Sequence, residues 1–301
     1  MIAIPDVLSA LQPRTAAAWQ AALNTVLPFT DSKLLQHCHR QLSAAQRRTV
    51  SRAPDDCSAL ERAVSRFADQ FAVSVDGISE AQLAELTGLM DEQAVNALAN
   101  AVYLLDMGLR LELVVPKVLD GQPALDEEVA HGCGINAGAP DGDDPDEVMA
   151  SVIAEFAAQA VLADEVDPVT SELVRLRCAQ THHCRLCGSL RQRSALDAGL
   201  QAGVAETIAR YESSDFAAHQ VAALHLCDAL TLNPADADGS LREELEEHFS
   251  PSQIAEICFD VVKWSQQKAL VALGSDAPPW EGVHVLDFDA GGHPVFAGPL
   301  A

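Results

Sequence analysis

Apolar residues recur at helical spacing along most of the chain, whereas the alternation of apolar and polar residues that is typical of strands is scarce. Between residues 60 and 73, for example, Val64, Phe67 and Phe71 fall on one face of a helix. Similar stripes and capping signals predict helices at residues 16–26, 30–48, 79–88, 91–109, 148–162, 215–230, 240–249 and 251–274. The predicted fold class is therefore all-α.

One segment near the C-terminus departs from this pattern. Residues 283–296 contain short runs of β-forming residues on both sides of Gly291-Gly292, a dipeptide that favours a tight turn. We expect this tail to form a small β-hairpin.

A helix, a break and a second helix are predicted in the middle of the second half. Asp167 is a good N-cap residue, and Pro168 suits the first position of a helix. We expect this helix to break at His182 and His183 and a second helix to span residues 184–198. Any side chain near residue 184 would then lie in the first turn of the second helix.

Two cysteines occupy that first turn. Cys184 and Cys187 form a CxxC motif, and unsatisfied N–H groups together with the helix dipole favour thiolate over thiol there. Arg185 lies between them, and Arg191 follows one predicted helical turn after Cys187, so cationic charge is close. Two thiols at this spacing can also close a disulfide, which makes the motif capable of redox chemistry.

Charge and composition restrict the possible partners and surroundings of the chain. Its 301 residues carry a formal net charge of −25, which makes nucleic acids and anionic membranes poor partners. No run of about 18 apolar residues predicts a membrane span, and the first residues do not resemble a signal peptide. Eight cysteines without such a signal indicate a reducing compartment, where a close pair is more often catalytic or metal-binding than structural. We therefore expect a cytoplasmic protein.

The order of the predicted helices repeats, which indicates an internal duplication. Residues 63–71 are similar in pattern to residues 222–230, and Lys33 in the first half takes the place of Glu172 in the second. The predicted organisation is a degenerate repeat without CxxC at residues 1–120, an acidic Gly/Pro-rich linker at 121–147, a repeat with CxxC at 148–275, and a tail at 276–301.

The spacing of Glu172, Cys184 and Cys187 resembles the alkylhydroperoxidase D and carboxymuconolactone decarboxylase superfamily. In that superfamily a Glu precedes the CxxC motif by twelve residues, and a His follows the second Cys by four. The resemblance covers about residues 150–275, including Glu-Leu-Val-Arg-Leu-Arg before the motif and Ser-Ala-Leu-Asp-Ala-Gly after it. It implies two tandem alkylhydroperoxidase D-like helical repeats, a homo-oligomer (a dimer or larger), and a peroxiredoxin-type antioxidant activity without a bound cofactor or metal.

The resemblance also implies roles for individual residues. Cys187 would attack a hydroperoxide or disulfide substrate, Cys184 would resolve the product as a disulfide, and an external thiol reductant would reduce it. Glu172 would relay a proton. Arg191 stands where the family has His, and a guanidinium can stabilise a thiolate but cannot accept a proton. Proton transfer would then pass to His182 or His183, or to the carboxylate through water. The candidate catalytic residues are Cys184, Cys187, Glu172, His183 and Arg191.

Other interpretations of the same residues remain open. Glu172 can equally be a surface acid paired with Arg175 or Arg177 on its own helix. The CxxC cysteines can ligate zinc with Cys178 and a neighbouring histidine, although zinc sites usually combine two separated ligand pairs. The alternative functions are a catalytically degenerate oligomeric binding or scaffold protein of the same fold, and a carboxymuconolactone decarboxylase-like lyase.

Overall fold

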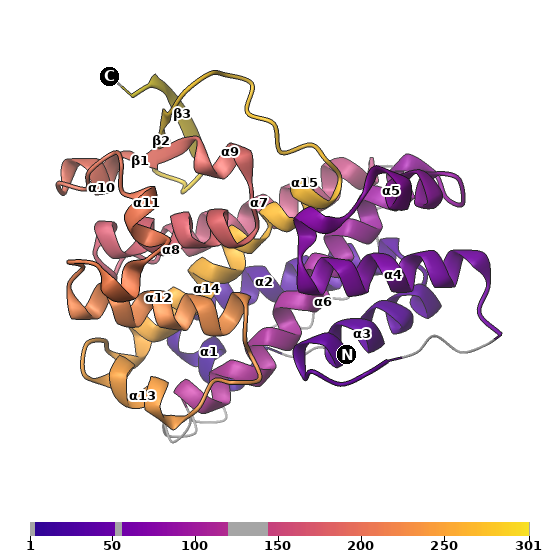
Figure 1. The fold of residues 1–301 in the computed structure, drawn as a ribbon, viewed down its shortest axis with the longest axis horizontal. Coiled ribbons are helices and arrows are strands. Elements are labelled where there is room, and N and C mark those ends of the chain that lie inside the picture. Colours follow the sequence, from indigo (N-terminus) through magenta and orange to yellow (C-terminus); the bar gives the residue numbers. More distant parts are fainter. Residues whose placement is uncertain (1–3, 52–55, 120–143, 301) are drawn as a thin grey trace.

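A computed structural model describes residues 4–51, 56–119 and 144–300, and most of these residues are helical (Figure 1). The chain before the second gap forms α1 (Asp6–Leu11), α2 (Pro13–Val26), α3 (Ser32–Gln46), α4 (Ala59–Val73), α5 (Glu80–Thr87) and α6 (Glu92–Val118). The chain after it forms α7 (Pro145–Val161), α8 (Pro168–Thr181), α9 (Arg185–Gly188), α10 (Arg193–Asp197), α11 (Ala205–Ile208), α12 (Ala218–Thr231), α13 (Gly239–Glu246), α14 (Pro251–Ser265) and α15 (Gln267–Ala272). Short 3₁₀ helices lie at Leu27–Phe29, Val75–Gly77 and Tyr211–Ser213, and the strands are β1 (Leu190–Gln192), β2 (His284–Phe288) and β3 (Pro294–Pro299).

The prediction of a mostly helical protein with a C-terminal hairpin is confirmed. Local signals in the sequence define several helix starts. Ser79 and Ser250 each cap a helix by accepting the N–H of a Gln three residues later, whose side chain bonds back to the cap N–H. Asp91 and Asp167 cap α6 and α8 with a carboxylate that accepts N–H groups of the first helical turn.

One continuous hydrophobic core contains residues from both halves of the chain. α6 crosses the middle of the molecule, and helices of the second half pack against it (Figure 1). The Tyr103 hydroxyl on α6 donates to the Val262 carbonyl on α14 at 3.0 Å, and Trp19 on α2 contacts Phe156 on α7 with ring centroids 4.9 Å apart. The two predicted repeats therefore share one core.

The prediction of a single helix over residues 184–198 is wrong. The chain forms the four-residue α9, then β1, then the five-residue α10. β1 pairs in parallel with β2, with Leu190 opposite His284 and Gln192 opposite Leu286, and β2 pairs antiparallel with β3. The hairpin tail thus gains a third strand from the CxxC region. Helix propensity in this segment is overridden by the backbone hydrogen bonds that the distant hairpin offers.

Further helix boundaries differ from the predictions, since α2 begins at Pro13 and α6 continues to Val118. α12 begins at Ala218 instead of residue 215, because the Phe216 N–H donates to the Ser214 hydroxyl and forms a turn. The helix predicted to reach residue 274 is divided at Gln266, whose N–H bonds three residues back to Lys263 and not four.

The predicted linker is shorter than expected at its C-terminal end. α7 begins at Pro145, and Asp144 caps it by accepting the Asp146 N–H at 3.1 Å. The remainder of the linker, up to residue 143, lies outside the described residues.

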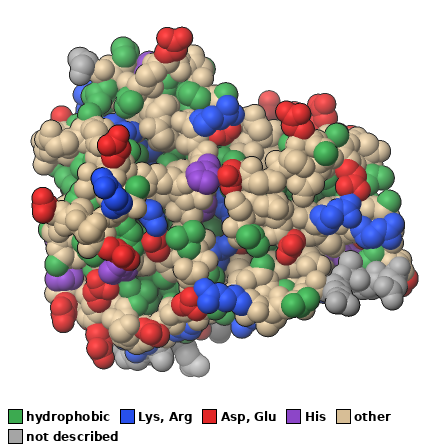
Figure 2. All heavy atoms as spheres, viewed as in Figure 1, with side chains coloured by type: hydrophobic (Ala, Val, Ile, Leu, Met, Phe, Trp, Pro, Cys, Tyr) green, Lys and Arg blue, Asp and Glu red, His purple; other side chains and the backbone are tan. Residues whose placement is uncertain are grey.

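The surface agrees with the acidic composition. Figure 2 shows acidic side chains over most of the visible face, with fewer Lys and Arg side chains between them. Within the part of the chain that the structure describes, no helix is both long and apolar enough to cross a membrane.

Candidate functional site

The break between α8 and the CxxC motif forms where the sequence predicts it. His182 is the C-cap residue of α8, and His183 adopts a left-handed backbone conformation with φ of 52°. The Cys184 N–H then donates to the Ala179 carbonyl at 2.9 Å, which satisfies one carbonyl at the end of α8. The chain reverses at this point and presents the motif at the start of α9.

The structure joins Cys184 and Cys187 as a disulfide, with Cα atoms 5.4 Å apart. Cys184 is the N-cap residue of α9, and its Sγ accepts the Cys187 N–H at 3.2 Å. Both cysteines are buried and pack against Ala179, Leu186 and Val271. The prediction that both lie in the first turn of a helix is confirmed, although that helix has only four residues.

Asp276, in the segment after α15, holds the start of α9 in place. Its carboxylate accepts the Arg185 N–H at 2.8 Å and the Arg185 guanidinium at 2.6 Å, while its carbonyl accepts the Leu186 N–H at 2.9 Å. Burial alone would raise the pKa of Asp276, but the hydrogen bonds from Arg185 outweigh it and lower that pKa. A lone Asp that is 91 residues away carries no signal that sequence reasoning can use.

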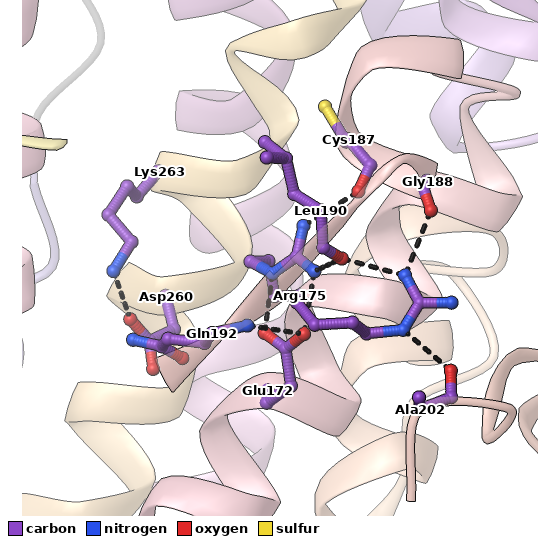
Figure 3. Close-up of polar contacts among 10 residues, drawn as sticks. Glu172, Arg175, Cys187, Gly188, Leu190, Gln192, Ala202, Asp260 and Lys263 are labelled. Atoms are coloured by element: carbon purple, nitrogen blue, oxygen red, sulfur yellow. Dashed lines mark hydrogen bonds and ion pairs between the residues drawn. The ribbon is translucent and has the colours of Figure 1, made fainter. Parts of the chain in front are cut away.

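Glu172 forms a buried ion pair with Arg175, three residues later on α8 (Figure 3). The guanidinium donates to both carboxylate oxygens at 2.5 and 2.6 Å, and the Gln192 N–H donates to one of them at 3.2 Å. The side chains of the pair are 0% and 1% exposed. The pairing considered from the sequence is therefore present, but in the interior and not on a helix surface.

Arg175 connects this ion pair to the cysteine motif. Its guanidinium also donates to the Cys187 carbonyl at 2.9 Å and to the Leu190 carbonyl at 2.7 Å (Figure 3). The Glu172 carboxylate thus holds the Arg175 guanidinium in position, and the guanidinium in turn binds the main chain before and after residues 188–189.

Arg191 lies on β1 and not one helical turn beyond Cys187, which corrects the sequence expectation. Its guanidinium donates to the carbonyls of Gly188, Leu190 and Ala202 at 2.9, 2.7 and 3.0 Å. It is buried, and it ties β1 to the loop that precedes α11. These contacts give Arg191 a structural role.

The two histidines before the motif have different surroundings. His182 is buried and its Nε2 lies 3.0 Å from the Ser265 hydroxyl, while burial and then the charge of Lys268 lower its pKa well below the usual value. His183 is exposed, and its Nδ1 lies 2.6 Å from an Asp76 carboxylate oxygen. Neither histidine is among the described residues that line the pocket beside Cys187.

That pocket has a volume of about 180 Å³ and lies between the C-terminal hairpin, α7 and α14. Its lining includes Cys187, Lys263, Trp264, Leu286, Phe288 and Phe296. A larger, shallow hollow of about 950 Å³ lies over α3 and includes none of the predicted site residues. The smaller pocket is therefore the relevant one, because it contains a motif cysteine.

Lys263 brings a positive charge to the wall of this mostly apolar pocket. Its ammonium lies 2.8 Å from an Asp260 carboxylate oxygen and 4.5 Å from the centre of the Trp264 ring. Burial raises the pKa of Asp260, and the charge of Lys263 opposes that rise. Sequence reasoning missed Lys263, whose only signal is a cation within an apolar helix.

The position of Cys178 does not support the alternative that this residue binds zinc together with Cys184 and Cys187. Cys178 on α8 faces α12, where its Sγ lies 3.6 Å from the Sγ of Cys227. The structure therefore does not group it with the CxxC pair.

Two curated proteins are similar to this chain, each with 34% identity over 244 residues that cover 81% of this chain and 83% of the relative. They are "Uncharacterized protein MT2376" of Mycobacterium tuberculosis (strain CDC 1551 / Oshkosh) and "Uncharacterized protein Rv2313c" of Mycobacterium tuberculosis (strain ATCC 25618 / H37Rv). No protein-family description matches the chain. No solved structure matches it either.

Proposed function

This chain belongs to the same family as the mycobacterial proteins Rv2313c and MT2376, and we propose that it is a thiol-dependent oxidoreductase that reduces hydroperoxides or exchanges disulfides. One observation carries the proposal: Cys187 is in disulfide contact with Cys184 and also lines a mostly apolar pocket. A substrate in that pocket would lie against Cys187, the residue whose sulfur is to be oxidised.

The proposed reaction begins with the thiolate of Cys187. It attacks the terminal oxygen of a hydroperoxide, the O–O bond breaks, and the sulfur becomes a sulfenic acid while an alkoxide leaves and takes a proton. The thiol of Cys184 then attacks that sulfur, which forms the disulfide and releases water. An external dithiol reduces the disulfide and returns both cysteines to the thiol state.

The surroundings support this division of roles. Cys187 lines the pocket, whereas Cys184 is the helix cap whose sulfur accepts the Cys187 N–H. The Lys263 ammonium has three donors, and it can direct one into the pocket while another binds Asp260. We assign Lys263 the stabilisation of the leaving alkoxide.

Glu172 is assigned a positioning role in this proposal and not a proton relay. Both of its carboxylate oxygens are engaged by Arg175, and that arginine holds the Cys187 carbonyl.

The two-repeat architecture is part of the same proposal. Three pairs of helices, α4 and α12, α5 and α13, and α6 and α14, begin at residues 59 and 218, 80 and 239, and 92 and 251, in each case 159 residues apart. α3 and α8 both end in a left-handed residue, Arg48 and His183, which are 135 residues apart. That spacing aligns His37, and not Lys33, with Glu172.

The proposal requires an external thiol reductant and a reducing compartment such as the cytoplasm, and it includes the expected homo-oligomer. Sedimentation of the purified chain at micromolar concentration tests the last point: a dimer or larger species is expected, and a monomer would remove oligomerisation from the proposal.

Peroxide treatment tests the chemistry directly. After reduction and mild oxidation, mass spectrometry of the wild type should find a peptide crosslinked between Cys184 and Cys187, and peroxide should be consumed with a dithiol reductant. Cys187→Ser should abolish consumption, and Cys184→Ser should leave a sulfenic acid at Cys187. Cys258→Ser, which changes a buried cysteine on α14, is the matched control and should retain full activity. Absence of both the crosslink and the consumption would refute the proposal.

A second candidate is a non-catalytic binding protein of the same fold, and the surroundings of Arg191 favour it. The arginine bonds to three main-chain carbonyls and offers no proton acceptor. Under this alternative, Cys184→Ser and Cys187→Ser leave every cellular phenotype of the wild type unchanged.

A further inference from the structure

A second cluster of chemically reactive side chains lies between α3 and α4, outside the site described above. His37 on α3, Glu61 on α4 and Cys57, which directly precedes the N-cap residue of α4, each offer one potential ligand atom to the cluster. These three atoms lie within 4.8 Å of one another, and all three residues are buried. α3 and α4 pack side by side at a distance from the three-stranded sheet and the CxxC motif (Figure 1).

The three groups match the ligand preferences of zinc. Thiolate, imidazole and carboxylate are the protein ligands that bind this ion, and three protein ligands with a water in the fourth position is a common arrangement. Bonds of about 2.0–2.3 Å to a tetrahedral ion separate the ligand atoms by about 3.5 Å. The observed separations, which are within 4.8 Å, would therefore close by about 1.3 Å at most when an ion binds.

The orientation of His37 fits such a role. Its Nδ1 lies 3.5 Å from the Ser65 hydroxyl oxygen, and that hydroxyl donates its own proton to the Glu61 carbonyl at 2.7 Å. The serine oxygen can therefore only accept from the ring, which favours the tautomer with a proton on Nδ1. In that tautomer Nε2 carries the free lone pair, and it lies on the side of the Glu61 carboxylate, 3.9 Å from Oε1. Metal-binding histidines commonly have this kind of partner on the second nitrogen.

The carboxylate is held in position by its helix. Glu61 Oε2 accepts the Ser58 N–H at 2.7 Å as part of a capping box, and Oε1 faces the ammonium of Lys33. The Lys33 side chain is 70% exposed. It can therefore move into solvent and leave Oε1 to an ion, while the bond from Ser58 keeps the carboxylate aimed at the cluster.

We propose that His37, Cys57 and Glu61 bind a divalent transition-metal ion of the zinc type, with water as the fourth ligand. The site is independent of the thiol chemistry proposed for Cys184 and Cys187. It joins the segment before α4 to α3, so the bound ion should stabilise the packing of these two helices.

Cobalt(II) binding tests the proposal, because a thiolate ligand gives Co²⁺ an intense charge-transfer absorption. The protein should carry Cys184→Ser and Cys187→Ser, so that the CxxC pair cannot contribute a sulfur. After treatment with chelator and reductant, titration with Co²⁺ should show one equivalent bound with that absorption, and Zn²⁺ should displace it.

Three ligand variants and one control variant in this background distinguish the site from incidental binding. Cys57→Ser should remove the charge-transfer band, whereas Cys38→Ser, which changes a buried cysteine on the same helix as His37, should keep it. His37→Ala and Glu61→Gln should each weaken zinc affinity, measured by calorimetry, by at least about tenfold, which is the lower end of the loss when even an outer-shell partner is removed.

Circular dichroism confirms that each variant is folded before it is titrated. A wild-type-like band in Cys57→Ser, no saturable binding in the parent protein, or unchanged zinc affinity in both His37→Ala and Glu61→Gln would each overturn the proposal. If Cys57→Ser does not fold, the two affinity measurements on the other variants decide the outcome.

Discussion

Replacing Arg175 by Met tests the central structural claim about the site, that a buried ion pair holds the CxxC loop. The substitution keeps most of the volume of the side chain but leaves the Glu172 carboxylate in the interior, where the Gln192 N–H is its one remaining hydrogen-bond donor among the residues that the structure describes. It also removes the donors to the Cys187 and Leu190 carbonyls. The cost should therefore be dominated by an uncompensated buried charge and not by lost packing.

The expected magnitude follows from the burial of both partners. Removal of one member of a buried ion pair typically costs about 3–5 kcal/mol. With side chains 0% and 1% exposed, this pair belongs in that range. The double variant Glu172→Leu/Arg175→Met should be more stable than Arg175→Met alone by at least about 1 kcal/mol, because it removes the unpaired charge.

Urea unfolding followed by circular dichroism, with reductant present so that the disulfide does not contribute, measures these free energies. Arg66→Met is the control, since it breaks an ion pair with Glu85 whose side chains are 50% and 42% exposed and should cost at most about 1 kcal/mol. A loss in Arg175→Met no larger than that of the control would refute the reasoning. So would strict additivity of the two single changes in the double variant.

A further variant, Glu172→Gln, separates a positioning role from proton relay for Glu172. If the carboxylate acts by holding Arg175, Glu172→Gln should lower stability and peroxidase activity together, without shifting the pH dependence of the activity. A shifted pH profile in a fully stable Glu172→Gln protein would instead show that the carboxylate transfers protons.

Further predictions concern the hairpin, one buried acid and one helix cap. A Cβ at Gly292 would lie 2.5 Å from a main-chain oxygen of α7, so Gly292→Ala should lift the hairpin and speed iodoacetamide modification of reduced Cys187. The control is Gly298→Ala, a position with a similar positive φ but no close neighbour, which should leave the rate unchanged. Equal rates for the two variants would show that the hairpin does not cover the pocket. Burial and a neighbouring carboxylate raise the pKa of Glu256 from 4.5 to about 7, so the folded protein binds this proton more tightly than the unfolded chain. The stability from this group should be complete below pH 4.5 and disappear as the pH rises to about 7, and Glu256→Gln should remove that part of the slope in unfolding free energy against pH. Ser250→Ala should lower the stability by about 1 kcal/mol and the midpoint of thermal unfolding with it, because α14 loses a capping box.

The sequence predicts the local structure at the cysteine motif better than the contacts that surround the motif. The N-cap at Asp167, the break after His182 and the position of Cys184 at a helix start are all local features, and the structure confirms them. The helical propensity of residues 184–198 predicts Arg191 on a helix, but pairing with the hairpin puts it on β1. Its contacts, and those of Glu172, could be assigned only once the neighbouring backbone was in place.

The sequence by itself determined the helical fold class, most helix starts and the hairpin tail. These depend on apolar spacing, capping side chains and turn residues, which act over a few residues along the chain. The tertiary structure alone decided that Asp276 holds α9, that Lys263 and the hairpin complete a pocket beside Cys187, and that His37, Cys57 and Glu61 meet between two helices. Most of those contacts join residues that are tens of positions apart, and the packing of the shared core brings them together.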